Sequence, residues 1–155
     1  MIKFILIIKK TVTIINQKLS EMIETGFAFN LEFLVRDYEC DLQSVVNNAN
    51  YQHYLEHARH EYLLSKGVSF VQLHEEGIDL IVTKVEIEYK YPLKSHDRFN
   101  VCVNIQREGN ARLVFIQDIY RLPDEKHIVH AKVTGVATKK GRPVAPGKII
   151  EQLGL

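Results

Sequence analysis

The sequence is short of three features that often point to a protein's class: cysteine, an excess of charge, and long apolar runs. Its two cysteines, Cys40 and Cys102, form no disulfide framework and match no zinc-ligand spacing. A formal net charge of +1 in 155 residues gives no general attraction to nucleic acid or to an anionic membrane. These shortages predict a reduced, cytoplasmic protein with neither nucleic acid nor membrane as a partner.

The apolar run at the start, MIKFILIIKK, is far too short to span a bilayer, and no small-residue cleavage pattern follows it. An interfacial helix, a weak targeting segment and translated sequence upstream of a start at Met22 are all open interpretations of this stretch. We therefore divide the chain into an N-terminal extension of unknown role, residues 1–26, and a single domain, residues 27–155.

Apolar spacing divides the domain into elements. Alternation predicts a strand over residues 27–35. After a polar stretch, an apolar stripe at spacings of three and four predicts one long helix, capped by Asn47 or Asn48 and ended at Lys66-Gly67. The stripe consists of Tyr51, Tyr54, Leu55, Ala58 and Tyr62.

Four more strands follow the helix. Residues 78–91 alternate in two phases, and the change of phase near Thr83-Lys84 predicts a bulge. Turn residues separate three later strands, and a short helix is expected in the tail. The order strand, helix, four antiparallel strands joined by tight turns predicts an α+β domain in which one long helix lies across a five-stranded sheet.

The polar stretch before the helix suits acyl chemistry. The free amides of a first helical turn carry partial positive charge and can stabilise a carbonyl oxygen that becomes negative during a reaction. Asp41 lies seven residues before Asn48, close enough for the loop to fold it back as a general base or nucleophile. The same residues also suit a helix that is only well capped, so the pattern alone leaves both interpretations open.

Two motifs resemble those of one known family. The stretch VRDYECDLQSVVNNANYQHYLEHARHEYL resembles the signature of the 4-hydroxybenzoyl-CoA thioesterase-like hotdog proteins, and VEIEYKYPLKSHDRF resembles their second strand. The resemblance covers roughly residues 27–140. It implies a hotdog fold, with the sheet wrapped around the central helix, and hydrolysis of an acyl thioester carried by coenzyme A or acyl carrier protein. It implies no metal, and no cofactor beyond the coenzyme A moiety of the substrate.

The same resemblance implies roles for single residues. Asp41 matches the family's catalytic aspartate, and Asn48 matches the position whose backbone N–H polarises the thioester carbonyl. Glu56 stands where a related branch carries its catalytic carboxylate, so it is a second candidate. Tyr51 and Tyr54 would line or order the site from the helix.

Two positions depart from the family's pattern. Ser44, in the loop after Asp41, stands where many relatives have glycine, and His96 replaces a glycine that often precedes the aspartate matching Asp97. The first departure is expected to reshape the loop that carries Asp41.

Two features of the sequence, a basic cluster and open sheet edges, suggest which partners the protein binds. Lys139, Lys140 and Arg142 suit the phosphates of coenzyme A or an acidic carrier protein, and equally a solvated turn. Five strands around one helix leave sheet edges for a partner to cover. The resemblance implies a homodimer, or a dimer of dimers, with the site at the interface.

Two further groups have a structural interpretation that we favour. His53, His57 and His60 share one face of the helix, but a solvated or subunit-facing surface explains them better than a metal site. Cys40 has no base partner nearby in sequence, so a buried structural role is favoured over that of a nucleophile.

Overall fold

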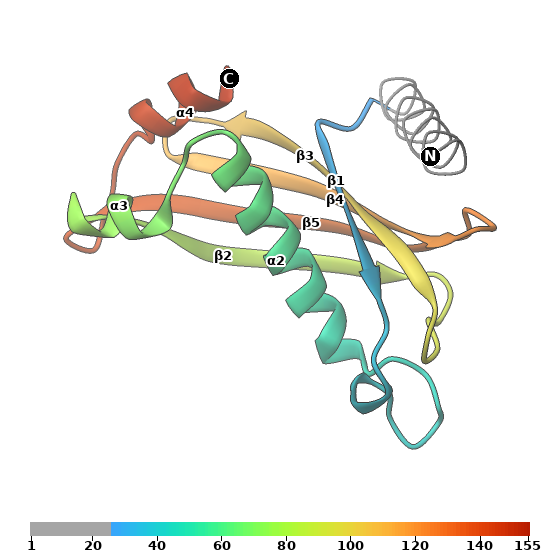
Figure 1. Cartoon of the computed structure of the whole chain (residues 1–155). Helices are drawn as coiled ribbons and strands as arrows, with labels where there is room; N and C mark the ends of the chain where they lie inside the picture. Colours follow the sequence, from blue (N-terminus) through green and yellow to red (C-terminus); the bar gives the residue numbers. More distant parts are fainter. Residues whose placement is uncertain (1–25) are drawn as a thin grey trace, which may run out of the picture.

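The structure, a computed structural model, describes residues 26–155, so the predicted extension lies outside the described residues except for Gly26. One long helix lies across one face of an antiparallel sheet (Figure 1). In sheet order the strands are β1 (Phe29–Leu34), β3 (Arg98–Glu108), β4 (Arg112–Leu122), β5 (His127–Lys139) and β2 (Ile78–Tyr89), with β6 (Arg142–Pro143) beside β5. The helices are the 3-10 turn η1 (Asp37–Glu39), α2 (Asn48–Ser65), α3 (Phe70–Glu75) and α4 (Gly147–Leu153). Within residues 26–155, no helix is long and apolar enough to cross a membrane.

The long helix α2 begins and ends where the sequence predicts. The Asn47 side chain caps it by accepting a hydrogen bond from the Ala49 N–H at 3.0 Å. At the other end, Gly67 takes a left-handed backbone (φ 78°) directly after the cap residue Lys66. Every residue of the predicted apolar stripe is buried, so the stripe is the face that α2 turns toward the sheet.

Aromatic rings join α2 to two strands, β1 and β3. The rings of Phe33 and Phe99 stack with centroids 5.3 Å apart, and the ring of Tyr54 lies 4.8 Å from that of Phe99. Full burial of such a side chain contributes about 1.5–3 kcal/mol. These contacts fix the start of α2 over the β1 edge of the sheet.

One connection differs from the tight turns expected throughout. β2 pairs with β5 rather than with β3, so residues 90–97 carry the chain past two strands. The crossing covers three strand spacings, about 14 Å in all, and eight residues can span up to roughly 26 Å. The Val46 N–H donates to the Leu93 carbonyl at 2.8 Å, and the Val35 N–H donates to the Asp97 carbonyl at 2.9 Å. The crossing segment is therefore bonded to the residues that lead into α2.

The long strands carry irregularities in register, one of them predicted. The β2–β5 pairing shifts between Val82 and Lys84, which confirms the bulge expected from the change of phase. The β4–β5 pairing shifts between Ile119 and Tyr120, which the sequence pattern did not predict. The tail helix is present as α4, whereas α3 and the two-residue β6 were not predicted.

Two non-glycine residues with left-handed backbones stand where the family pattern expects glycine. Ser44 has φ 60° and His96 has φ 65°. The left-handed backbone at Ser44 strains the loop that carries Asp41.

Replacement of Ser44 by glycine is expected to stabilise the protein. Glycine adopts φ 60° without the Cβ clash, which costs an ordinary residue about 1–2 kcal/mol, and part of that gain is lost to greater freedom of the unfolded chain. Urea unfolding of Ser44→Gly should show a gain of about 0.5–1 kcal/mol. The neighbouring Gln43→Gly, at a residue without a positive φ, should lose stability. A loss in both variants would contradict the prediction.

Candidate active site at the start of the long helix

The loop that carries Asp41 folds back toward the start of α2. Cys40 and Val46 form a β-bridge, and the Asp41 N–H donates to the Val45 carbonyl at 2.9 Å. The Ser44 N–H donates to the Asp41 carbonyl at 3.0 Å and closes the turn. Asp41 is thereby held opposite a residue that lies three positions before Asn48.

The Asp41 carboxylate is partly tied to its own loop. Its Oδ1 accepts a hydrogen bond from the Gln43 N–H at 2.8 Å, while Oδ2 has no hydrogen-bond partner in the described part of the chain. The residue is half-buried. One oxygen thus orients the carboxylate, and the other is left for a ligand.

The first turn of α2 offers one unbonded backbone donor. Asn47 takes up two of the free amides, because its side chain accepts from the Ala49 N–H and its carbonyl accepts from the Asn50 N–H at 2.9 Å. The Asn48 N–H has no acceptor among residues 26–155, and Asn48 is exposed. This donor lies at the positive end of the helix dipole, where a developing oxyanion is stabilised.

Glu39 organises this region, and sequence reasoning missed it. The residue is only 6% exposed, and its side-chain Oε2 accepts hydrogen bonds from the Tyr54 hydroxyl at 2.7 Å and from the Arg36 N–H at 2.8 Å. Its backbone carbonyl accepts from the Asn47 N–H at 2.9 Å and from Asn50 Nδ2 at 2.7 Å. One residue of η1 therefore holds both the cap and the first turns of α2.

No sequence signal marks Glu39 as buried, because glutamate is usually exposed and its partner Tyr54 lies fifteen residues away. Tyr54, which was expected to line or order the site, is buried and points its hydroxyl at Glu39. Its hydroxyl is committed to Glu39, and burial together with that hydrogen bond raises the pKa of Tyr54. The hydroxyl is thus kept protonated as a donor to the carboxylate.

A cavity of about 240 Å³ opens beside the helix start. Val46 and Asn48 form one side of it, and Tyr89 and Tyr91 form the other. Tyr51 also lines this cavity. The crossing segment holds its side chain in place, because the Tyr51 hydroxyl accepts a hydrogen bond from the Leu93 N–H at 3.0 Å. Burial raises the pKa of Tyr51.

The hydroxyl of Tyr89 also reaches the helix start, where it donates to the Asn48 carbonyl at 3.2 Å. The cavity beside Asn48 is therefore bounded by the end of β2 as well as by α2.

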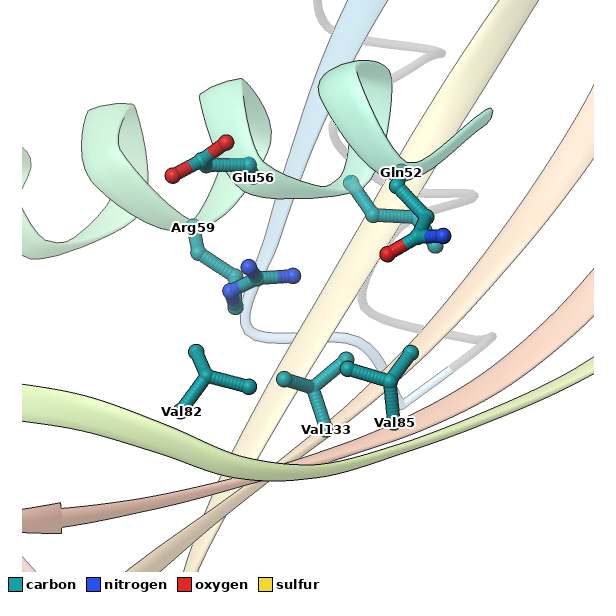
Figure 2. Close-up of a pocket in the computed structure, with 7 residues that line it drawn as sticks. Gln52, Glu56, Arg59, Val82, Val85 and Val133 are labelled. Atoms are coloured by element: carbon teal, nitrogen blue, oxygen red, sulfur yellow. The ribbon is translucent and has the colours of Figure 1, made fainter. Parts of the chain in front are cut away.

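A second cavity, of about 210 Å³, lies farther along α2 and faces β2 and β5 (Figure 2). Val82, Val85 and Val133 form its floor, and Figure 2 shows Arg59 extending from the helix toward them. Arg59 Nη1 donates to the buried Gln117 side chain at 2.9 Å, and burial lowers the pKa of Arg59 to about 10. Across this groove, the valines therefore lie opposite two charged side chains of α2, Arg59 and Glu56.

Glu56 lines this groove rather than the cavity at the helix start. Eight residues separate Glu56 from Asn48, which corresponds to a rise of about 12 Å along the helix. Within one chain, the Asp41 loop therefore folds back along Val45 and Val46, just before the helix cap, whereas Glu56 lines the other cavity.

The basic cluster also lies away from the helix start. Lys139 pairs with Ile78 at the beginning of β2, and Lys140 and Arg142 follow in the turn and in β6. The helix start instead contacts Tyr89, at the other end of the same strand. Eleven residues of extended chain separate these two ends, or roughly 36 Å. One chain does not bring the cluster to the Asp41 loop.

The surroundings of the α2 histidines and of Cys40 agree with the structural roles favoured for them. His53 and His57 are exposed, and the ring of His60 lies 4.6 Å from that of Phe70. These three histidines do not form a group that could hold a metal ion among the described residues. Cys40 is half-buried and packs against the core.

Comparisons with known proteins cover this region. The family model described as the thioesterase-like superfamily matches residues 35–149. A chloroplastic acyl-acyl carrier protein thioesterase from Arabidopsis thaliana is 38% identical over 117 residues, which are 74% of this chain and 60% of the relative. An acyl-CoA thioesterase from Haemophilus influenzae is 30% identical over 127 residues, 80% of this chain and 90% of the relative.

Solved structures agree with these matches. The crystal structure of a hypothetical protein from Aquifex aeolicus superposes with a TM-score of 0.75 at 28% identity, and the match covers 81% of this chain and 98% of that chain. The plant relatives are longer, since the chain spans 60% and 59% of the two Arabidopsis thioesterases it matches.

The hydrogen bond between Tyr54 and Glu39 is expected to contribute far more to the free energy of unfolding than the hydrogen bond between Tyr89 and Asn48. Tyr54→Phe leaves a buried carboxylate without one of its donors, and we expect a loss of about 1.5–3 kcal/mol in the free energy of unfolding. The matched control is Tyr89→Phe, which removes an exposed hydroxyl and should cost less than about 0.5 kcal/mol. Urea unfolding measures both, and equal losses would show that Glu39 does not organise the helix start.

Proposed function

Because the chain belongs to the thioesterase-like superfamily, we propose that it hydrolyses an acyl thioester at the start of α2. The proposal is carried by the pairing of a half-buried carboxylate, Asp41, with the unbonded N–H of Asn48. The activities named for the relatives from Arabidopsis thaliana and Haemophilus influenzae support the same reaction.

In the proposed reaction, the thioester carbonyl lies against the Asn48 N–H, which stabilises the negative charge that develops on its oxygen. Asp41 either takes a proton from water as the water attacks the carbonyl carbon, or attacks that carbon itself to form an acyl–aspartate anhydride that water then hydrolyses. The carbon–sulfur bond breaks, the thiolate leaves and receives a proton, and the net result is water consumed with a carboxylic acid and a thiol released. No metal or cofactor takes part beyond the carrier portion of the substrate.

The groove along α2 is the proposed place of the acyl chain. It starts at the second turn of the helix, and its floor of valines offers apolar contact. Tyr51 lines the cavity nearer the reacting carbonyl. Relatives named for coenzyme A esters and for acyl carrier protein esters both support the proposal, so both carriers belong in the test.

We also propose that the protein is a homodimer, or a dimer of dimers, formed through β2. Among residues 26–155, this strand is the last in the sheet path and pairs with β5 alone, and its side chains at Ile81, Val82 and Val85 are exposed. Leu42, at the tip of the Asp41 loop, is fully exposed as well. Apolar side chains along an open edge favour association with a second chain.

Antiparallel pairing of two β2 strands would complete the site. A two-fold axis at the middle of the strand places the Ile78 end of one copy beside the Tyr89 end of the other. The turn that carries Lys140 and Arg142 would then approach the helix start of the second copy. The basic cluster, which is remote within one chain, thereby acquires a place from which to bind a phosphate or an acidic carrier.

Light scattering tests the association. At micromolar concentration we expect twice or four times the chain mass of 17.9 kDa. Ile81→Lys places a charge on the exposed part of β2 without adding one to the groove along α2, and it should shift the protein toward the monomer. The wild-type protein would contradict the proposal if it gave only the 17.9 kDa species.

The catalytic assignment predicts a large loss of turnover in Asp41→Asn. Asparagine preserves the size of the side chain but neither accepts a proton from water nor attacks as a carboxylate, so kcat/KM should fall by about 10²- to 10⁴-fold. Thiol release from aromatic, short-chain and long-chain esters of coenzyme A and of acyl carrier protein identifies the substrate on which this is measured.

Glu56→Gln is the matched control, since it removes the same charge from the middle of the helix and should cost much less. Circular dichroism confirms that both variants are folded. A collapse of turnover only in Glu56→Gln would assign the chemistry to the other carboxylate, and a folded Asp41→Asn protein with full turnover would end the proposed mechanism. The same pair decides whether the chain follows the aspartate branch, typical of 4-hydroxybenzoyl-CoA thioesterases.

A further inference from the structure

Three side chains with metal-binding atoms converge on two neighbouring strands outside the proposed active site. Asp118 lies on β4, and His127 and His130 lie on β5. Asp118 Oδ1 is 2.7 Å from His127 Nε2 and 2.9 Å from His130 Nδ1. One ligand atom from each residue lies within 4.8 Å of the others.

This cluster faces away from α2. Gln117 turns toward the helix, because its Nε2 donates to the Leu55 carbonyl at 2.9 Å. Successive side chains of a strand point to opposite faces of the sheet, so Asp118 points to the outer face. The cluster is therefore separated from the groove along α2 by the thickness of the sheet.

A bulge in β5 brings the two histidines together. In a regular strand, residues three apart point to opposite faces. Here Ile119 pairs with Val129 while Tyr120 pairs with His127, so Ile128 is an extra residue in the register. The bulge turns His127 to the same face as His130, which is the re-aiming of a side chain that bulges produce near functional sites.

The exposure of the three side chains suits a bound ion. The Asp118 side chain is 8% exposed, whereas those of His127 and His130 are 30% and 43% exposed. The carboxylate is thus held at the base, and the imidazoles leave access from solvent. The outer face also carries Asn100 Oδ1, the one buried side-chain oxygen without a hydrogen-bond partner within residues 26–155.

We propose that Asp118, His127 and His130 bind one divalent transition-metal ion, with Zn²⁺ as the reference. Imidazole nitrogen and carboxylate oxygen are preferred ligands of such ions, at distances of about 2.0–2.2 Å. Two atoms on one ion at these distances lie at most about 4.4 Å apart, so small rotations of the imidazoles suffice. Water fills the remaining coordination position.

The ion clamps β4 to β5 on the outer face. Its ligands come from the end of β4 and the start of β5, on either side of the turn that joins these strands. Because the sheet separates the ion from Asp41 and Asn48, it stabilises the fold and takes no part in thioester hydrolysis. The site accordingly stands or falls independently of the proposed function.

Titration calorimetry with Zn²⁺ tests the site on the chelator-treated, full-length protein without a polyhistidine tag. We expect one Zn²⁺ per chain and a rise in melting temperature on binding. His127→Gln and His130→Gln should each weaken binding by at least about tenfold, since even residues that only support a metal ligand contribute about 10- to 100-fold. His53→Gln, an exposed histidine on α2, is the matched control and should bind like the wild type.

Visible absorption of the Co²⁺-loaded protein gives a second readout. Histidine and carboxylate ligation should produce d–d bands that Zn²⁺ displaces and that both cluster variants lose, while circular dichroism shows them to be folded. Absence of Zn²⁺ binding by the wild type, or equal binding by His127→Gln and His130→Gln, would show that the three residues form only a hydrogen-bonded network and would overturn the proposal. Loss of binding in His53→Gln would overturn it too, by placing the ion on α2.

Discussion

The start of α2 depends on one buried carboxylate. Glu39 is costly to bury, and it is tolerated because it accepts hydrogen bonds from the Tyr54 hydroxyl and the Arg36 backbone N–H. Its own carbonyl holds Asn47, the residue that caps the helix. The Asp41 loop begins two residues later, so its position relative to the helix is set by the same bonds. Packing alone would leave a polar loop of this kind free to move; the buried charge gives it one position.

Local physics was predictable from the sequence, and long-range pairing was not. The ends of α2 and the bulge near Thr83 follow from caps, spacing and a change of phase, which neighbouring residues determine. The crossing over residues 90–97 and the place of β2 beside β5 depend on which strands meet, and no short window carries that information. The same distinction separates Asp41, whose closeness to the helix start could be anticipated, from Glu39, whose partner is distant in sequence. His127 and His130 show it again, because their spacing predicts opposite faces until the bulge is known.

The surface around the helix start is open to solvent in a single chain. Polar groups that could hold a thioester carbonyl face outward beside Tyr38 and Leu42, two exposed apolar residues. The loop beside this surface is also strained, since Ser44 holds a left-handed backbone that serine does not favour. In the proposed dimer, the second chain covers this surface and so takes part in setting the acyl preference.

The edge strand β2 also forms a wall of the cavity beside α2, because its residue Tyr89 contacts both Asn48 and Tyr51. If chains pair through β2, association and substrate binding share the same residues, and thermodynamic linkage makes the two events reciprocal. A ligand that orders the end of β2 would then tighten the association of chains, and association would in turn prepare the cavity. The substrate affinity of such a protein would rise with its own concentration, and monomers in dilute solution would bind substrate weakly until enough chains were present to associate.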